Sequence, residues 1–463
     1  MFMLYRRYLR DLEEWISRSD RKPLMVWGAR QCGKTYLVRD IFAEGHFPGK
    51  YVYIDCRAEP EVCSYIESHP RAKDVLSFIS LRFDTEIDGS TLVIFDEAQE
   101  CPAVITLMKY FCQDCREVPV IVTGSMVRIR IKRKKRGSLQ EEFLFPVGKI
   151  NEITMTPLSF DEFLYNRNLR MYRIVTEAYR SGKPLDAPVH KMAMDLLYEY
   201  LMVGGMPEAV ATMLDTGSYT KARNVIKELY ANYLSDMELY QASPESIVRS
   251  KAIFSNIYPM LERESKNFSP SVIEEGTRNR DMMSPIDWLS EAHIINVSHL
   301  LKEHVTVPLR SSEGSFRVYL ADMGMFSYQS GTNPASFLSD DGRNALSGIF
   351  FENYVAEEFS SRGIPLFYWK GKSDSEFEFV VQKDSRVMPV DAKKGRGPMN
   401  SLKRFREHND RGTAVKISAN NAGYDDVSDI RTIPLYQAFM FADEIVSETE
   451  ELMIDIDTIT VPE

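Results

Sequence analysis

The segment Gly28-Ala29-Arg30-Gln31-Cys32-Gly33-Lys34-Thr35 matches the pattern GxxxxGK[ST] and decides the fold. It follows an apolar run at 23–27 and opens a helical pattern at 34–42, which is the context that this motif requires. The glycines let backbone N–H groups surround phosphates at the positive end of the helix dipole. We therefore expect all eight residues to bind a nucleotide, with Lys34 on the β- and γ-phosphates and Thr35 on Mg²⁺.

A second apolar run, TLVIF at 91–95, ends in the acids Asp96 and Glu97. Acids at the end of a buried strand place Asp96 beside the metal and Glu97 where it can orient and deprotonate an attacking water. Catalytic roles therefore fall to Glu97 and Lys34, and metal ligation to Thr35 and Asp96. The acid that follows the aspartate favours hydrolysis over a kinase reaction.

Short apolar runs alternate with helical patterns over the first third of the chain, which predicts an α/β fold with a doubly wound parallel sheet. The run at 118–123 is expected to lie between the two motif-bearing strands. It ends at Thr123 and is followed by Gly124 and Ser125; Thr123 and Ser125 are candidates for sensing the γ-phosphate. A simple turn after a buried strand is the alternative for these two residues.

The middle of the chain, 157–310, has helical periodicity. Ser284 and Pro285 have the pattern of a helix start, and the alternating segments VSHLL and VTVPL follow that helix. Helices that end in a hairpin suggest a winged helix-turn-helix. Such a unit binds nucleic acid in some proteins and is a packing module in others.

A second α/β unit is expected over 311–463, after an ATPase core at 1–156 and the helical region at 157–310. Glu376 to Phe379 read as one alternating strand, with Phe377 and Phe379 on one face. Carboxylates from Glu352, Glu378 and Asp391 could surround a metal, with Lys393 beside them to activate water or stabilise a phosphorane. The alternative is two solvated strand faces.

Composition bounds the class of protein. A chain of 463 residues with 44% apolar and 27% charged residues predicts two or three globular domains. The formal net charge of −10 is uneven, because an acidic tail at 443–463 contrasts with seven positive charges at 128–136. Anionic partners are therefore not excluded. The absence of a membrane span or signal peptide leads us to expect a cytoplasmic protein.

All six cysteines lie at or before Cys115. A disulfide framework is typical of small secreted chains, so it is not expected here. Cys112-x-x-Cys115 has the spacing of half a zinc site, but no second pair completes it. Its position in an apolar-periodic helical stretch favours packing.

Taken in order along the chain, these motifs resemble a prokaryotic family of AAA-type ATP-binding proteins. That family is related to STAND and archaeal-type ATPases and carries a C-terminal domain of unknown function with a nuclease-like fold. The matches include the phosphate loop, DEAQ at 96–99, TGS at 123–125, PLSFDEF at 157–163, GGMPE at 204–208, YLADMGMF at 319–326, FFENYV at 350–355, YWK at 368–370 and DAK at 391–393.

The resemblance implies a P-loop NTPase sheet, ATP and Mg²⁺ as cofactors, and a restriction-endonuclease-like core that maps its acids onto Glu352, Glu378 and Asp391 beside Lys393. Two positions depart from the family pattern. Glu378 stands where aspartate is common, and Lys149 stands where an arginine is common before the PLSF segment. Because lysine lacks the planar fork of an arginine finger, Lys149 is a weaker candidate sensor.

Three functions are compatible with these features. The leading hypothesis is an Mg²⁺-dependent ATPase whose nucleotide state rearranges the winged-helix and nuclease-like domains. The second is a nucleotide-dependent binding switch with an inert docking domain, and the third is an active metal-dependent nuclease. ATP is the expected ligand, no membrane is expected, and nucleic acid, a protein partner and homo-oligomer formation stay open.

Overall fold

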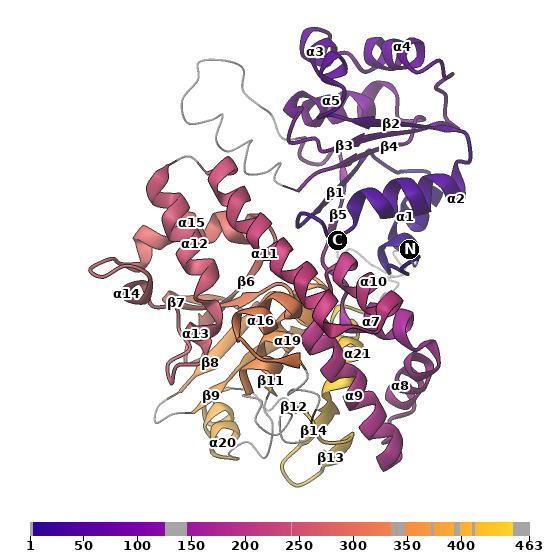
Figure 1. Cartoon of the computed structure of the whole chain (residues 1–463). Coiled ribbons are helices and arrows are strands. Elements are labelled where there is room, and N and C mark those ends of the chain that lie inside the picture. Colours follow the sequence, from indigo (N-terminus) through magenta and orange to yellow (C-terminus); the bar gives the residue numbers. More distant parts are fainter. Residues whose placement is uncertain are drawn as a thin grey trace, which may run out of the picture.

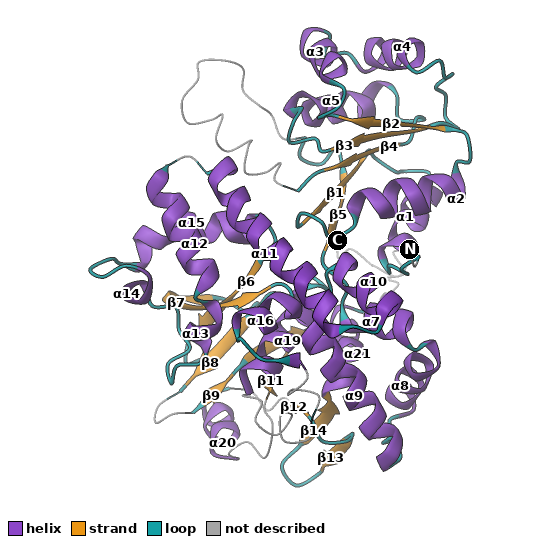
Figure 2. Ribbon diagram, in the orientation of Figure 1, coloured by secondary structure: helices purple, strands orange, loops and turns teal. Residues whose placement is uncertain are grey.

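The computed structural model describes residues 3–125, 146–241, 243–334, 339, 348–371, 375–392, 399–409 and 413–447. The basic run at 128–136, most of the acidic tail and Lys393 lie outside this part of the chain. Within it, the strands form three sheets (Figures 1 and 2). None of the helices described there has the length and apolar character needed to cross a membrane.

The N-terminal sheet has five strands in the order β2-β3-β4-β1-β5, and all neighbouring pairs are parallel. The predicted doubly wound parallel sheet is therefore confirmed, and β4 lies between the two motif-bearing strands. The elements are α1 (Tyr8–Ser17), β1 (Leu24–Gly28), η1 (Tyr36–Ala43), α2 (Glu44–His46), β2 (Tyr51–Asp55), α3 (Pro60–Ser68), α4 (Ala72–Arg82), β3 (Leu92–Asp96), α5 (Pro102–Asp114), β4 (Val120–Thr123) and β5 (Asn151–Met155).

Both faces of this sheet are covered, which explains its continuous apolar strands. In β1, Leu24 and Val26 pack in the core shared with α1 and η1, whereas Met25 and Trp27 pack in a second core with α3, α4 and α5. Figure 1 shows these two helix groups on opposite sides of the strands. Strands buried on both faces need apolar residues at every position.

The middle region is helical as predicted and continues the first core. Its elements are α7 (Phe160–Arg167), α8 (Leu169–Ser181), α9 (Ala187–Val203), α10 (Pro207–Thr216), α11 (Tyr219–Tyr240), α12 (Pro244–Ser255), α13 (Ile257–Leu261), α14 (Pro270–Ile273), α15 (Asn279–Glu291), β6 (Ile295–Leu301), β7 (Ser311–Leu320) and α16 (Met323–Gln329). The long helix α11 extends from beside α10 towards α12 and α15 (Figure 1).

Two details of the expected winged helix are wrong. The helix before the hairpin starts at Asn279 and not at Ser284, because the Asp281 carboxylate accepts the Arg278 N–H at 2.9 Å and caps the earlier turn. Pro285 therefore lies inside α15. The segment VTVPL is not a strand; β6 instead pairs antiparallel with β7, which begins at Ser311.

The remaining elements form the C-terminal α/β unit. They are α19 (Gly348–Ser360), β8 (Phe367–Lys370), β9 (Glu376–Phe377), β10 (Phe379–Lys383), β11 (Arg386–Ala392), α20 (Met399–His408), β12 (Ala414–Ser418), β13 (Gly423–Asp425), β14 (Ile430–Pro434), η2 (Leu435–Gln437) and α21 (Ala438–Val446). One sheet has the order β10-β11-β12-β14-β13 and the other has the order β7-β6-β8-β9. The hairpin β6–β7 thus shares a sheet with strands from beyond the expected domain boundary at residue 310.

The single strand expected over 376–379 is interrupted. Phe377 in β9 pairs with Trp369 of β8, whereas Phe379 in β10 pairs with Val390 of β11. The two phenylalanines consequently pack in different cores, and not on one face as the alternation suggested. Glu378 is the residue at which the chain passes from one sheet to the other, and its side chain is buried.

Candidate nucleotide site

The phosphate loop joins the end of β1 to η1, and two of its positions require glycine. Gly28 has φ +143°, and a Cβ there would lie 2.2 Å from the Met155 carbonyl oxygen of β5. Gly33 has φ +93°, in a region that side chains rarely adopt. The loop backbone can therefore form the predicted nest only with these residues, and η1 directly follows it.

Lys34 and Thr35 stand at the mouth of this loop. The buried Lys34 ammonium donates to the carbonyl oxygens of Gly28 and Ala29 at 3.0 and 2.8 Å. The Thr35 hydroxyl donates to the Asp96 carboxylate at 2.6 Å. The two motifs, separated along the sequence, are thus in direct contact.

Asp96 ends β3 and accepts hydrogen bonds on both carboxylate oxygens. Tyr53 donates its hydroxyl to Oδ2 at 2.7 Å, and the Glu97 N–H donates to Oδ1 at 2.9 Å. The Thr123 hydroxyl also donates to Oδ1. Burial and this contact with Asp96 raise the pKa of Tyr53, which keeps its hydroxyl a donor. Together with Thr35, these donors fix the orientation of the Asp96 carboxyl group.

Glu97 follows Asp96 in a strained backbone conformation, with φ +52°. Its carboxylate accepts a hydrogen bond from the Gln99 amide, and the Gln99 carbonyl oxygen accepts the Ser125 N–H at 3.4 Å. Ser125 and Thr123, the candidate sensors at the end of β4, consequently lie against the acidic motif. The role of Gln99 was missed from the sequence, although the DEAQ motif contained it.

A buried arginine supports the loop from behind, and sequence reasoning did not single it out. Arg6 donates from Nη1 to the Cys32 carbonyl at 2.6 Å, from Nη2 to the Thr156 carbonyl at 2.6 Å and from Nε to Glu162 at 2.9 Å. Both charged side chains are at most 2% exposed. A buried ion pair therefore connects the phosphate loop to the PLSFDEF segment.

Helix α11 contacts the outer side of the loop. Arg30 forms an ion pair with Asp236, and the Tyr233 hydroxyl donates to the Arg30 carbonyl at 2.8 Å. Burial raises the pKa of Asp236, although the Arg30 charge opposes this effect. These contacts tie a residue of the phosphate loop directly to the helical region.

Lys149 is not brought to this site. It is exposed in the turn before β5, whose first residue, Asn151, is paired with Leu24 at the start of β1. The phosphate loop leaves the opposite end of β1, about five strand residues or roughly 16 Å away. Within one chain, Lys149 therefore cannot sense the γ-phosphate as its sequence position suggested.

The expected nuclease-like acids converge only in part. The Lys266 ammonium bonds the buried Glu352 and lies 4.0 Å from Glu378, so both acids share one cation. Glu352 also accepts from Tyr319 at 2.8 Å and from the buried Arg317 at 3.3 Å. Asp391 lies one residue beyond the Phe379–Val390 pair that ends the pairing of β10 with β11, and Glu378 immediately precedes β10. Lys393 lies outside the described residues.

The family models that match this chain agree with the parallel sheet and the phosphate loop of its N-terminal domain. Residues 20–164 match the model of a family described as an AAA domain. Residues 194–336 and 347–437 match two domains of unknown function, DUF8612 and DUF4143. The chain thus carries an AAA-type P-loop domain followed by domains of unknown function, which confirms the first part of the expected resemblance. No curated protein matches the chain.

Several solved structures are similar to this chain. A Walker-type ATPase of Pyrococcus abyssi is 17% identical, with a TM-score of 0.42, over 71% of this chain and 96% of that one. The replication initiator DnaA bound to AMPPCP and single-stranded DNA is 14% identical, with a TM-score of 0.26, over 63% and 88%. AMPPCP-bound DnaA from Aquifex aeolicus is 12% identical, with a TM-score of 0.26, over 62% and 90%.

Proposed function

We propose that this chain is an Mg²⁺-dependent ATPase, and the contact between Thr35 and Asp96 carries the proposal. A hydroxyl and a carboxylate 2.6 Å apart beneath a glycine-bounded phosphate loop are the oxygen ligands that Mg²⁺ uses beside phosphates. Mg²⁺ held by these two residues would neutralise charge on the β- and γ-phosphates. The residues present therefore fit the ion.

Lys34 and Glu97 perform the remaining steps in this proposal. From the loop mouth, the Lys34 ammonium can contact the phosphates as a point charge. Glu97 orients the attacking water and accepts its proton, with Gln99 holding one carboxylate oxygen in place. Thr123 fixes the metal-side carboxylate of Asp96, and this role supports its assignment as a sensor.

In this proposal, Arg30 transmits the nucleotide state of the phosphate loop to helix α11 and the helical region. Its ion pair with Asp236 and the Tyr233 hydrogen bond attach α11 to the loop, and α11 packs on α12 and α16. A loop that shifts on phosphate binding would therefore pull on the helical region. The hairpin β6–β7 is joined to β8, which favours a packing role for the winged helix over a free DNA-binding wing.

For the C-terminal unit we propose an inert docking domain and not an active nuclease. Lys266 and Arg317 already supply positive charge to Glu352, where a nuclease would place a metal ion. Lys266 lies in the segment between α13 and α14, and its ammonium takes the place of a metal ion beside Glu352. This arrangement supports the hypothesis that the C-terminal unit is an inert docking domain of a binding switch. Equal cleavage of labelled DNA by wild type and Asp391→Ala, in Mg²⁺ or Mn²⁺, is the expected result.

Phosphate release from ATP tests the main proposal. Wild-type protein with Mg²⁺ should release phosphate, whereas Lys34→Ala should not exceed background. Lys50→Ala, an exposed lysine before β2 in the same domain, is the matched control and should retain the wild-type rate. Tightly bound ATP without turnover in wild-type protein would contradict hydrolysis and favour a switch that only holds nucleotide.

A further inference from the structure

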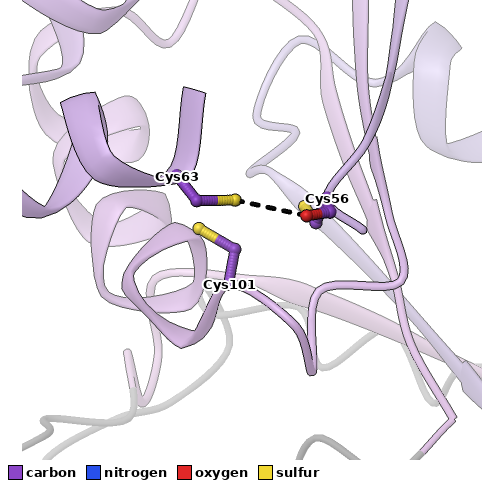
Figure 3. Close-up of side chains that lie close together, drawn as sticks. All are labelled: Cys56, Cys63 and Cys101. Atoms are coloured by element: carbon purple, nitrogen blue, oxygen red, sulfur yellow. Dashed lines mark hydrogen bonds between the residues drawn. The ribbon is translucent and has the colours of Figure 1, made fainter. Parts of the chain in front are cut away.

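Three cysteines outside the nucleotide site meet in space. The Sγ atoms of Cys56, Cys63 and Cys101 all lie within 4.8 Å of one another. They come from three separate elements: Cys56 follows β2, Cys63 lies on α3, and Cys101 precedes α5. Figure 3 shows Cys63 beside Cys101 and across from Cys56, with the Cys63 thiol directed at the Cys56 carbonyl oxygen. The sequence offered no sign of this, because the spacings of 7 and 38 residues match no common metal motif.

We propose that these three thiols bind a thiophilic divalent cation of the zinc class. Thiolates are the preferred ligands of such ions, and a Zn–S bond of about 2.3 Å places tetrahedral sulfurs about 3.8 Å apart. The present separations therefore need a contraction of at most about 1 Å. On binding, three S–H groups lose their protons to solvent as three sulfur–metal bonds form.

The environment suits a site that keeps one open position. Cys56 and Cys101 are buried, whereas Cys63 is half-buried and gives the site contact with solvent. In the part of the chain that the structure describes, no His, Asp or Glu side chain joins the three cysteines in this cluster. A water molecule would therefore complete four-coordination, as in zinc sites with three protein ligands.

The cluster lies beside the acidic motif of the ATPase site. The Cys56 N–H donates to the Asp96 carbonyl at 3.0 Å, and the Cys101 N–H donates to the Ala98 carbonyl at 3.1 Å. A bound cation would thus join the ends of β2 and β3 through the loop that carries Glu97. This site does not depend on the proposed ATPase function, because its own ligands define it.

Cobalt binding to the reduced full-length protein tests the site. After metal removal, Co²⁺ should bind with one-to-one stoichiometry and produce thiolate-to-cobalt charge-transfer absorbance, which Zn²⁺ should abolish. Cys63→Ser should weaken cobalt binding at least tenfold. Cys112→Ser, a half-buried cysteine on α5 outside the cluster, should bind like wild type.

Thiol alkylation gives a second measurement that needs no variant to fold. Zn²⁺ should protect Cys56, Cys63 and Cys101 of the wild-type protein from alkylation and leave Cys112 reactive. No charge-transfer band, the same band in Cys63→Ser, or equal alkylation with and without Zn²⁺ would each overturn the proposal. A disulfide within the cluster of the reduced, metal-treated protein would overturn it as well.

Discussion

Arg6 and Glu162 form a buried ion pair, 2.9 Å from Nε to Oε1, although 156 residues separate them in the sequence. The same guanidinium donates to the Cys32 carbonyl inside the phosphate loop. The Glu162 carboxylate also accepts the Arg7 N–H and caps the start of α7 through Ser159. The pair therefore fixes the back of the nucleotide site to the first turn of the helical region.

Arg6→Met should destabilise the protein by about 3–5 kcal/mol, because it leaves the Glu162 charge buried without its partner. Urea unfolding of wild type and variant measures the loss. Arg10→Met removes an exposed pair with Glu14 and should change stability by less than about 1 kcal/mol. Similar losses for the two variants would show that the buried pair has no special role.

Gly28→Ala should abolish nucleotide binding. The new Cβ would lie 2.2 Å from a backbone oxygen of β5, at a φ that alanine rarely adopts. Fluorescent ATP-analogue titration measures the effect. Gly45→Ala, where a Cβ meets nothing within 4 Å, should bind like wild type. Unchanged affinity in Gly28→Ala would contradict the geometry of the loop.

Glu97→Gln should retain ATP and lose about 10²- to 10⁴-fold in phosphate release, because the amide cannot accept the proton of water. Equilibrium binding and single-turnover kinetics separate the two effects. Gln99→Ala should reduce turnover less, since it removes only the hydrogen bond that orients Glu97. A Glu97→Gln variant with wild-type turnover would exclude Glu97 as the base.

Asp236→Ala should uncouple α11 from the phosphate loop while ATP still binds. Wild-type α11 should gain hydrogen-exchange protection on adding ATP, and the variant should gain less because Arg30 loses its partner. Glu228→Ala, an exposed residue of the same helix, is the control. Equal protection in Asp236→Ala and wild type would rule out this relay.

Two glutamates of α19 should give opposite pH dependences. Burial would raise the pKa of Glu352, but the charges of Lys266 and Arg317 outweigh it and lower that pKa. The ionised Glu352 therefore stabilises the folded protein fully above about pH 4.3, which is the usual pKa of a glutamate in the unfolded chain. This stabilisation is lost as the pH falls through the lower pKa of Glu352 in the folded state. Glu352→Gln should accordingly destabilise the protein at pH 7 and have less effect in acid.

Glu357 should behave in the reverse sense. Burial and the nearby Asp322 raise its pKa well above the usual value, and Tyr200 is its hydrogen-bond donor. The folded state therefore retains a proton that the unfolded state releases, so stability falls as the pH rises above about 4.3. Glu357→Gln should flatten this decline between pH 5 and 8 in urea unfolding. A steeper decline would contradict a neutral Glu357.

The sequence by itself determined the elements that local pattern controls. Apolar runs are patterns of consecutive residues, so the strands β1 to β4 were predicted correctly. The same local pattern located the glycine-bounded loop after β1 and the acids Asp96 and Glu97 at the end of β3, whose roles stay predictions. Pro285 misled the helix assignment, because a proline favours a first turn but is also accommodated inside a helix whose earlier turn is capped.

Only the tertiary structure decided which distant side chains meet. Arg6 with Glu162, Arg30 with Asp236, Lys266 with Glu352 and the three thiols are each brought together by the packing of separate elements. It also placed Lys149 at the wrong end of the sheet for a sensor and divided Phe377 from Phe379. Such contacts depend on strand order and helix packing, which residue spacing along the chain does not encode.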